Sequence, residues 1–408
     1  MKLRRLPTYL RGKIGLPSSK SISNRLLILN WLFNKRLEIH GLSDAEDTKV
    51  LMRALQDLDK QEDIYYTLDV GESGTAFRFL TAYLSVRPGI YLLTGGRRMQ
   101  QRPVGPLVEA LKELGARIAY VHNQGYPPLY IEGQLLQGGK TEVDCKVSSQ
   151  FASAVFLIGA GMEQGLEIKV KNLVSASYLQ LTINLLESLG LRVKQGNDVY
   201  FIQRCQIKNS QIFVEKDWTS ASYWYGIVSL AQIGSELFFY GLKRESIQPS
   251  WRFIVEFYEK LGVKTEQETD GVILRKVRDP ELEFVRLELK DYPDLALTII
   301  VSLILHGIKF EIKGLEHLQY KESDRLSSLG QELGKIGIDL VHESSGAVTW
   351  HGQLAEKRNV EIESHADHRI LMAMSQLLMR YEQIEFKTSE VVRKSYPEFW
   401  DNLNNLYK

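Results

Sequence analysis

The chain has 408 residues, of which 44% are hydrophobic and 25% are charged. This length is too great for one ordinary hydrophobic core and favours two domains. The chain carries 51 basic and 50 acidic residues, so its composition excludes a generally basic nucleic-acid-binding protein and gives no sign of a partner in an anionic membrane. Any anion site must therefore come from basic residues that gather locally.

Local composition predicts a soluble protein of a reducing compartment. The first fifteen residues are basic but lack the apolar run of a secretory signal. The longest apolar stretch, 295–305, is about half the length of a bilayer span. Only two cysteines occur, Cys145 and Cys205, without the spacing of metal ligands. We expect a cytoplasmic monomer that binds neither membrane nor nucleic acid.

A helix end, a glycine and a strand start recur along the chain. The pattern first appears as ALKELGARI at 110–118 and returns three times. Its glycines lie 72 to 75 residues apart, at Gly115, Gly190, Gly262 and Gly337. A looser copy without glycine occupies 54–58, and the chain ends on a similar helical segment at 399–406.

A period near 70 residues exceeds the roughly 20–50 residues of most solenoid repeats. It suits a module of two helices and several strands, and five or six such modules would fill the chain. The spacing therefore predicts an α/β protein with two pseudo-symmetric domains of three modules each. Helix–glycine–strand junctions are common in all α/β proteins, so the junctions alone leave the repeat open.

Seven segments place cations, hydroxyls or glycines at the predicted start of an element. Each segment alone is also typical of a capped surface helix or an ordinary turn. In chain order they are 16–28, 71–78, 95–104, 147–151, 320–326, 364–374 and 392–397. A nearly neutral protein that repeats this arrangement is expected to assemble one strongly cationic cleft between its domains.

Three of these segments contain the most informative side chains. Lys20 and Arg25 lie near a predicted helix start, where free backbone N–H groups add to an anion site. Arg102 precedes a proline in a loop with three arginines, which favours binding of a carboxylate or phosphate group. His365 and His368 have a spacing that suits a metal, but no further ligand cluster is nearby. We therefore expect no metal.

Taken in order, the segments resemble the EPSP synthases, a family of enolpyruvyl transferases also described as 3-phosphoshikimate 1-carboxyvinyltransferases. The run LPSSKSISNR is similar to the family's LPGSKSxSNR signature. It is followed in the family's order by GESGTAFR, RRMQQRP, VSSQF, YPD, KESDR, ADHR and RKSYPEF, from about Lys13 to Trp400. LPxSKSxSNR and KESDRL are specific motifs, whereas GxSGT and SSQ count only together with the rest.

The resemblance implies a two-domain inside-out α/β barrel, in which each domain has three βαβαββ repeats with helices buried and sheets outside. A discontinuous lower domain would combine residues 1–19 with 218–408, and the upper domain would be 20–217, with the active site in the cleft between them. The implied reaction transfers the enolpyruvyl group of phosphoenolpyruvate to the 5-hydroxyl of shikimate 3-phosphate. It passes through a tetrahedral intermediate and belongs to chorismate and aromatic amino acid biosynthesis. The resemblance also implies that glyphosate would occupy the phosphoenolpyruvate site.

The same resemblance implies the roles of individual residues. Asp294 would take the 5-hydroxyl proton, and Glu322, helped by Lys20, would exchange the proton at the methylene carbon. Phosphoenolpyruvate would be bound by Lys20, Gly74, Arg102, Gln150, Arg325, Arg369 and Lys394. Shikimate 3-phosphate would be bound by Lys20, Ser21, Arg25, Ser148, Ser149, Gln150, Ser175, Tyr178, Asp294, His317 and Lys321. No metal or other cofactor is implied.

This assignment is chemically consistent. Two substrates with several negative charges require dense cationic neutralisation, and two carboxylates in different surroundings can divide the acid and base roles. Gly74, which has no Cβ, would leave room of about one methyl group beside phosphoenolpyruvate.

The chain departs from the family pattern at three places. Glu72 stands where the family often has asparagine, and its charge would repel phosphoenolpyruvate unless Arg78 or a lysine pairs with it. Ser-Ala-Ser-Tyr at 175–178 replaces the usual Ser-Lys/Arg-Pro-Tyr, and His317 falls where an asparagine often binds shikimate 3-phosphate.

Two other functions remain open from the sequence. The sister enzyme that uses UDP-N-acetylglucosamine usually has a reactive cysteine in the loop at 96–102, and this loop has none. A non-catalytic anion-binding homologue would keep the cleft but lose the chemistry. The joint presence of Asp294, Glu322, Lys20 and Lys394 argues against that second alternative.

Overall fold

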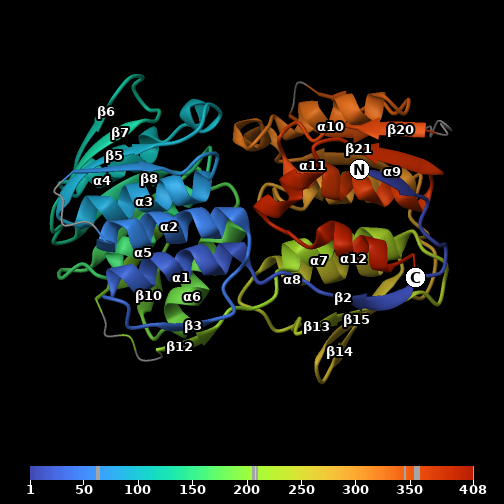
Figure 1. Cartoon of the computed structure of the whole chain (residues 1–408), viewed down its shortest axis with the longest axis horizontal. Helices are drawn as coiled ribbons and strands as arrows, with labels where there is room; N and C mark the ends of the chain where they lie inside the picture. The colour runs from blue at the N-terminus through green and yellow to red at the C-terminus, as the bar shows by residue number, and fades with distance from the viewer. Residues whose placement is uncertain (61–64, 205–206, 208–209, 344–345, 353–358, 408) are drawn as a thin grey trace. The chain divides into compact units, whose positions relative to one another are not determined.

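The structure, a computed structural model, describes residues 1–60, 65–204, 207, 210–343, 346–352 and 359–407. The chain forms two compact units (Figure 1). The discontinuous unit consists of Met1–Ser18 and Glu215–Lys408, and the continuous unit of Ser19–Val214. The sequence had suggested 1–19 with 218–408, and 20–217, so the chain passes between units at the same two regions. Cys205 lies outside the described residues.

One arrangement of strands recurs in both units. Its first copy runs through β4 (Tyr65–Asp69), α3 (Gly74–Val86), β5 (Gly89–Thr94), α4 (Gly105–Glu113), β6 (Arg117–Tyr120) and β7 (Leu129–Gly133). β4 and β5 are parallel, which requires a crossover such as α3, and β7 and β6 join as antiparallel neighbours. The sheet order is therefore β4-β5-β7-β6.

The second copy in the continuous unit has the same order of elements. It comprises β8 (Gly139–Asp144), α5 (Gln150–Gly159), β9 (Leu166–Lys171), α6 (Ala176–Ser188), β10 (Arg192–Gln195) and β11 (Val199–Gln203). Again the first two strands are parallel and the last two antiparallel. The unit also contains α1 (Lys20–Leu32), α2 (Glu46–Lys60) and a short parallel pair, β3 (Glu38–His40) with β12 (Gln211–Phe213).

The discontinuous unit repeats the arrangement. One copy comprises β16 (Phe284–Glu288), α9 (Ala296–Leu305), β17 (Lys309–Lys313), α10 (Arg325–Gly334), β18 (Val341–His342) and β19 (Val348–Trp350). The other comprises α7 (Trp218–Ser229), β13 (Glu236–Tyr240), α8 (Ser250–Lys260), β14 (Val263–Glu268) and β15 (Gly271–Lys276). Its first strand, parallel to β13, is β2 (Arg11–Ile14) from the start of the chain.

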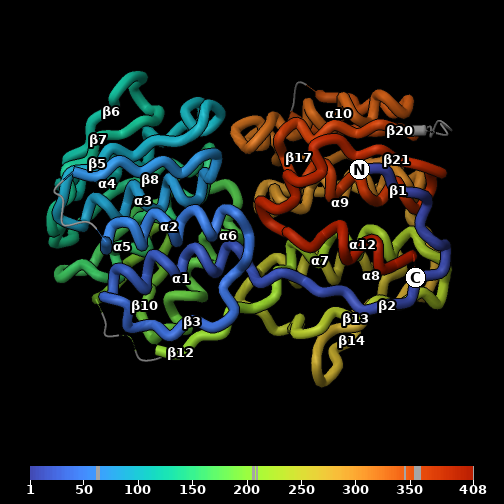
Figure 2. Tube along the Cα trace, in the orientation of Figure 1, coloured from blue at the N-terminus to red at the C-terminus, as the bar shows by residue number. Residues whose placement is uncertain are grey.

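The chain's two ends meet in one further sheet. β20 (Asn359–Ile362) and β21 (Gln383–Phe386) are parallel, with α11 (His368–Met374) between them, and α12 (Phe399–Asn405) follows. β1 (Lys2–Arg4) completes the sheet beside β21. Figure 2 shows this as the blue start of the chain running along its red end. The predicted α/β class is confirmed.

The four glycines of the sequence pattern occupy equivalent turns. They follow α4, α6, α8 and α10, and each has a positive φ, from 75° at Gly337 to 96° at Gly115. This left-handed conformation at a helix end strongly favours glycine. The regular spacing of these glycines in the sequence therefore reflects the regular spacing of the helix ends.

Several helices are apolar on all sides and form the cores of the units. Every residue of α9 is buried, as is every residue of α7 except Thr219, which is the pattern of a helix enclosed by other elements. α7 packs on α8 and α9, and α9 on α11, while in the continuous unit α5 packs on α3 and α6. Within the described ranges, no helix combines the length and apolarity that a membrane span requires.

Candidate active site

The predicted residues of the continuous unit lie at helix starts. We use the name helix-start cluster for Lys20, Ser21, Arg25, Gly74, Arg102, Ser148, Ser149, Gln150, Ser175 and Tyr178. Lys20, Gly74 and Gln150 are the first residues of α1, α3 and α5, and Ser175 is the N-cap residue of α6. Free N–H groups at helix N-termini attract anions. The positions are therefore suited to phosphate and carboxylate groups.

Lys20 is fixed by a carboxylate that the sequence analysis did not single out. Its Nζ lies 2.8 Å from Asp47 Oδ2, and both side chains are largely buried. Asp47 is in the first turn of α2. The ion pair holds the lysine at the start of α1, and the polar run at 43–48 was the only sequence signal for it.

Arg25 connects three helices. Its guanidinium donates to Thr182 Oγ1 at 2.7 Å, to the Tyr178 carbonyl at 3.1 Å and to Ser153 Oγ at 3.3 Å. It also donates to the carbonyl of Ser21. Burial lowers the pKa of Arg25 to about 10, although Tyr178 opposes that shift. In the structure Arg25 therefore links α1 to α5 and α6. Its contact with shikimate 3-phosphate remains a prediction.

Gln150 lies in a chain of hydrogen bonds between α3 and α5. Its Oε1 accepts from Arg78 at 2.7 Å, and its Nε2 donates to Thr75 Oγ1 at 3.1 Å. Ser148 accepts the backbone N–H of Gln150, and Ser148 and Ser149 are both buried. The amide is therefore oriented by its neighbours. Ser175, with φ of 57°, is also buried.

Glu72 organises the arginine loop through backbone groups. Its carboxylate accepts the N–H of Met99 at 2.8 Å and that of Arg98 at 3.3 Å. These groups open the 3₁₀ helix η1 (Met99–Gln101), which directly precedes Arg102. The sequence suggested that Arg78 or a lysine would pair with Glu72, and the structure shows backbone N–H donors at this carboxylate.

The space beside Gly74 is occupied by Arg102. A Cβ at Gly74 would lie 2.5 Å from Arg102 Nη1 and 2.7 Å from its Cζ. The expectation of free room for one methyl group was therefore wrong at this position, because the guanidinium fills it. Gly74 and Arg102 are nevertheless brought together, as their shared assignment to phosphoenolpyruvate requires.

The discontinuous unit contains a dense arginine–carboxylate cluster, which we define as Asp294, Glu322, Arg325, Asp367, Arg369 and Lys394. Arg325 donates through three nitrogens to three carboxylates: Asp294 at 2.8 Å, Glu322 at 2.7 Å and Asp367 at 2.8 Å. Burial alone would lower its pKa, but Asp367, Glu322 and Asp294 raise it above the ordinary value. Arg325 therefore stays charged while almost fully buried.

Asp294 bridges the two arginines of this cluster. Its second oxygen accepts from Arg369 at 2.7 Å, and Arg369 also donates to the hydroxyl of Tyr223 at 3.1 Å. Burial raises the pKa of Tyr223 to about 12, so the phenol remains protonated. Lys394 Nζ lies 3.9 Å from Glu322. The structure thus brings five predicted residues of this unit together.

His317 and Lys321 come from the 3₁₀ helix η2 (Glu316–Tyr320) and its C-cap position. His317 is 3% exposed. Burial lowers its pKa to about 3, helped by the positive charge of Lys321. The imidazole is therefore neutral at physiological pH and can offer a hydrogen bond but no charge.

The two histidines that could have suggested a metal have other surroundings. His365 Nε2 lies 2.6 Å from Glu332 Oε1, and His368 is buried at the first turn of α11. Among the residues that the structure describes, no group of three or more His, Cys, Asp or Glu side chains is arranged to hold a metal ion.

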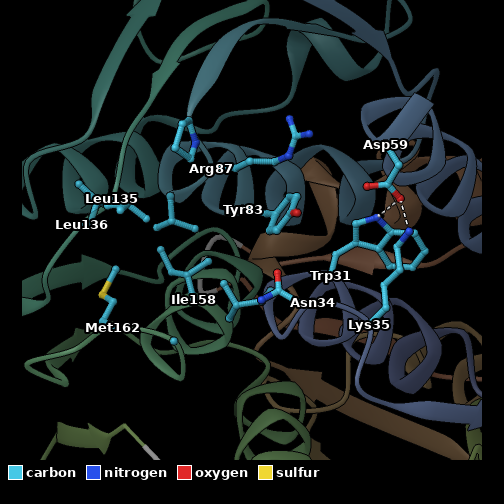
Figure 3. A pocket seen from close by; sticks show the side chains of 14 residues that line it. Trp31, Asn34, Lys35, Asp59, Tyr83, Arg87, Leu135, Leu136, Ile158 and Met162 are labelled. Carbon is cyan, nitrogen blue, oxygen red and sulfur yellow. Dashed lines mark hydrogen bonds and ion pairs between the residues drawn. The ribbon is translucent and has the colours of Figure 1, made fainter. Parts of the chain in front are cut away.

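A cavity of about 580 Å³ lies at the other ends of the same helices (Figure 3). Leu32, Val86 and Ile158, from the C-terminal turns of α1, α3 and α5, line it. Two of its charged groups bind one another, since Asp59 lies 2.6 Å from Lys35 Nζ, and Asp59 also accepts from Trp31 Nε1 at 3.0 Å. None of the described residues that line it belongs to the helix-start cluster.

Both clusters are typical of an enzyme that binds anionic substrates and transfers protons. The chain matches the family model described as EPSP synthase (3-phosphoshikimate 1-carboxyvinyltransferase) over residues 5–403. A relative named 3-phosphoshikimate 1-carboxyvinyltransferase from Bacteroides fragilis (strain YCH46) is 39% identical over 401 residues, covering 97% of this chain and 95% of the relative. The chain therefore belongs to the EPSP synthase family.

Further similarities agree with this membership. A relative of the same name from Buchnera aphidicola subsp. Cinara cedri is 32% identical over 427 residues, covering 98% of this chain and 95% of the relative. Among solved structures, an EPSP synthase from Acinetobacter baumannii has a TM-score of 0.76 at 21% identity, covering 99% of this chain and 98% of that one. The structural likeness supports the fold.

Proposed function

We propose that this chain transfers the enolpyruvyl group of phosphoenolpyruvate to the 5-hydroxyl of shikimate 3-phosphate and releases phosphate. The observation that carries the proposal is the placement of Asp294 and Glu322 on one guanidinium. Arg325 binds these carboxylates at 2.8 and 2.7 Å in the unit where the family resemblance assigns both proton transfers. Family membership supplies the identity of the substrates.

Substrate binding follows from the distribution of cations. The phosphate and carboxylate of phosphoenolpyruvate would engage Lys20, Arg102, Arg325, Arg369 and Lys394, with Gln150 as a neutral donor. In the arginine–carboxylate cluster, the negative charges of three carboxylates balance the positive charges of Arg325, Arg369 and Lys394. An anionic substrate would therefore compete with these carboxylates for guanidinium donors. The helix starts of the continuous unit would add N–H donors for shikimate 3-phosphate.

The proton transfers divide between two carboxylates with different neighbours. Asp294 is held by two guanidinium groups, which favour its charged form, the form that can accept the 5-hydroxyl proton. Glu322 has one close guanidinium and a more distant ammonium, so it is less strongly held and suited to exchange a proton at carbon. Lys20, fixed by Asp47, would assist that exchange.

The proposal extends to the architecture and to the state of the protein. Six βαβαββ repeats would form two inside-out barrels, and the helix-start and arginine–carboxylate clusters would act on the same reactants. The enzyme would be a cytoplasmic monomer. Size-exclusion chromatography with light scattering tests the oligomeric state.

One assay tests the reaction. The protein is incubated with phosphoenolpyruvate and shikimate 3-phosphate, and released phosphate is measured. UDP-N-acetylglucosamine serves as the alternative acceptor. We expect phosphate release when shikimate 3-phosphate is the acceptor and no release when UDP-N-acetylglucosamine is the acceptor. Release only with the nucleotide sugar would identify the sister activity, and release with neither acceptor would indicate a binding protein without chemistry.

A further inference from the structure

A buried carboxylate that the reaction does not use lies on α10. Glu332 has a relative exposure of 0%, and leaving such a carboxylate without partners would be costly. Its Oε1 bonds His365 Nε2 at 2.6 Å, and its Oε2 accepts from Lys335 Nζ at 2.7 Å and from the backbone N–H of Glu363 at 2.9 Å. Two of these three partners belong to the segment just before Arg369.

That segment is fixed to α10 at two points. Arg325 and Glu332 are seven residues apart on α10 and therefore share one face of the helix. Glu332 holds Glu363 and His365, while Arg325 binds Asp367 Oδ2 at 2.8 Å. The segment 363–367 is thus attached at both ends to the same helix face.

The backbone between these two points is strained. His365 and Ala366 have φ of 50° and 57°, a left-handed conformation that is unfavourable for non-glycine residues. Such a conformation persists only where the surroundings enforce it. Immediately after it, Asp367 caps α11 by accepting the N–H of Arg369 at 3.0 Å. The strained pair therefore lies directly before the N-cap of α11, the helix whose second residue is Arg369.

We infer that Glu332 and His365 are positioning residues for Arg369. The contact between Glu332 and His365 holds the left-handed turn, the turn sets the start of α11, and Arg369 then meets Asp294 at 2.7 Å and Tyr223 at 3.1 Å. Neither Glu332 nor His365 is among the proposed substrate ligands. Since Arg369 is proposed to bind phosphoenolpyruvate, the inference rests on the proposed function.

His365→Ala tests the inference through a split between kinetic constants. Displacing a binding group by about 1 Å can cost up to about 10²-fold, so we expect the KM for phosphoenolpyruvate to rise about tenfold or more. The KM for shikimate 3-phosphate should change by less than about threefold, because Arg369 is assigned to the other substrate. His365→Gln, which keeps an N–H donor, should recover part of the loss.

Two further arms separate positioning from general instability. The His365 side chain is 24% exposed, so added imidazole can reach the vacated space and should restore a low KM in His365→Ala. The matched control Lys335→Met removes the other side chain that contacts Glu332 but no residue of the turn, and it should leave both KM values within about twofold.

The possible results are distinct. An active wild type with an unchanged KM for phosphoenolpyruvate in His365→Ala would overturn the positioning role alone. Equal losses for both substrates, with a lowered melting temperature and no response to imidazole, would also overturn it and leave a purely structural pair. A wild type inactive with both acceptors would overturn the proposed function and this inference together.

Discussion

Arg325 is in contact with more negative charge than one guanidinium can neutralise. Three carboxylates lie within 2.8 Å of its nitrogens, and Arg369 and Lys394 balance the excess. Removing one carboxylate therefore leaves two to orient the guanidinium. This redundancy makes it possible to test Glu322 without losing the geometry of its neighbours.

We expect Glu322→Gln to bind both substrates but to turn over about 10²- to 10⁴-fold more slowly, the usual contribution of a general acid–base group. Steady-state kinetics and calorimetric binding of shikimate 3-phosphate measure the two effects separately. Glu316→Gln, at an exposed position nearby, is the control. Turnover within about threefold of the wild type would remove Glu322 from the mechanism.

Gly74→Ala should weaken phosphoenolpyruvate binding through Arg102. The new methyl would lie 2.5 Å from Arg102 Nη1, so the guanidinium of this buried side chain would have to move. Overpacking of this kind typically costs about 1–3 kcal/mol, and 1.4 kcal/mol corresponds to about tenfold. We expect about a tenfold rise in the KM for phosphoenolpyruvate.

Glyphosate supplies a second measurement for the same variant. If it occupies the phosphoenolpyruvate site, its inhibition constant should rise at least as much as the KM, because both anions would lose Arg102. An unchanged KM and an unchanged inhibition constant would show that Arg102 contributes to neither interaction.

The sequence could predict most residues of the two clusters but not how they are held. Motifs such as KESDR and ADHR contain the side chains that become site residues, so they were recognisable from local order. Asp47, Asp367 and Tyr223 received no role because their partners are remote in sequence: Asp367 is 42 residues from Arg325, and Tyr223 is 146 from Arg369. No local pattern contains such a pairing.

At the scale of the element, the glycines after the helices offer a matched test. Gly262 and Gly307 both end helices in the discontinuous unit, with φ of 82° and 73°. A Cβ at Gly262 would lie 1.8 Å from the Arg278 carbonyl oxygen, whereas a Cβ at Gly307 would meet nothing within 4 Å. The two positions therefore share the conformational cost but not the steric clash.

We expect Gly307→Ala to lower the free energy of unfolding by about 1 kcal/mol, the cost of a left-handed alanine. Gly262→Ala should lower it by about 3 kcal/mol, because backbone must also move. Urea denaturation of both variants measures the difference. Equal losses would mean that the turn after α8 adapts freely, contrary to the close contact with Arg278.

The helix ends were predictable because glycine punctuates them, but strand pairing was not. The four glycines indicated the repeat correctly. Nothing local indicated that β2 pairs with β13, more than two hundred residues later, or that β3 pairs with β12. These pairings depend on which hydrophobic faces meet in the folded chain, and local propensity does not encode that choice.

At the scale of the whole molecule, the two crossings of the chain make the discontinuous unit depend on two separate segments of the sequence. β2 belongs to the first segment but pairs with β13, and β12 belongs to the later part of the continuous unit but pairs with β3. β1 likewise joins β21 near the end of the chain. The discontinuous unit therefore cannot complete its sheets until residues from both ends of the sequence are available.

Two histidines whose pKa values are lowered in the folded chain should make that unit sensitive to acid. Burial lowers the pKa of His306 to about 3, with Lys276 adding to the shift and Asp279 opposing it. Burial also lowers the pKa of His317 to about 3. Both would titrate near 6.5 in the unfolded chain. Between pH 6.5 and 3 the unfolded state therefore binds more protons, so the stability from neutral histidine is complete above pH 6.5 and declines as the pH falls.

His306→Gln tests this dependence away from the proposed substrate ligands. Each proton taken up on unfolding changes the free energy of unfolding by about 1.4 kcal/mol per pH unit. Between pH 6 and 4, the free energy of unfolding of the variant should therefore depend on pH less steeply than that of the wild type, by about this amount. Urea unfolding followed by tryptophan fluorescence is suitable, because Trp218, Trp224, Trp251, Trp350 and Trp400 lie in the discontinuous unit and only Trp31 in the other. His342→Gln, an exposed histidine of the same unit, should keep the wild-type slope. A wild-type slope in His306→Gln would mean that His306 takes up its proton while the unit is still folded, despite its bond to Ser229 at 3.0 Å.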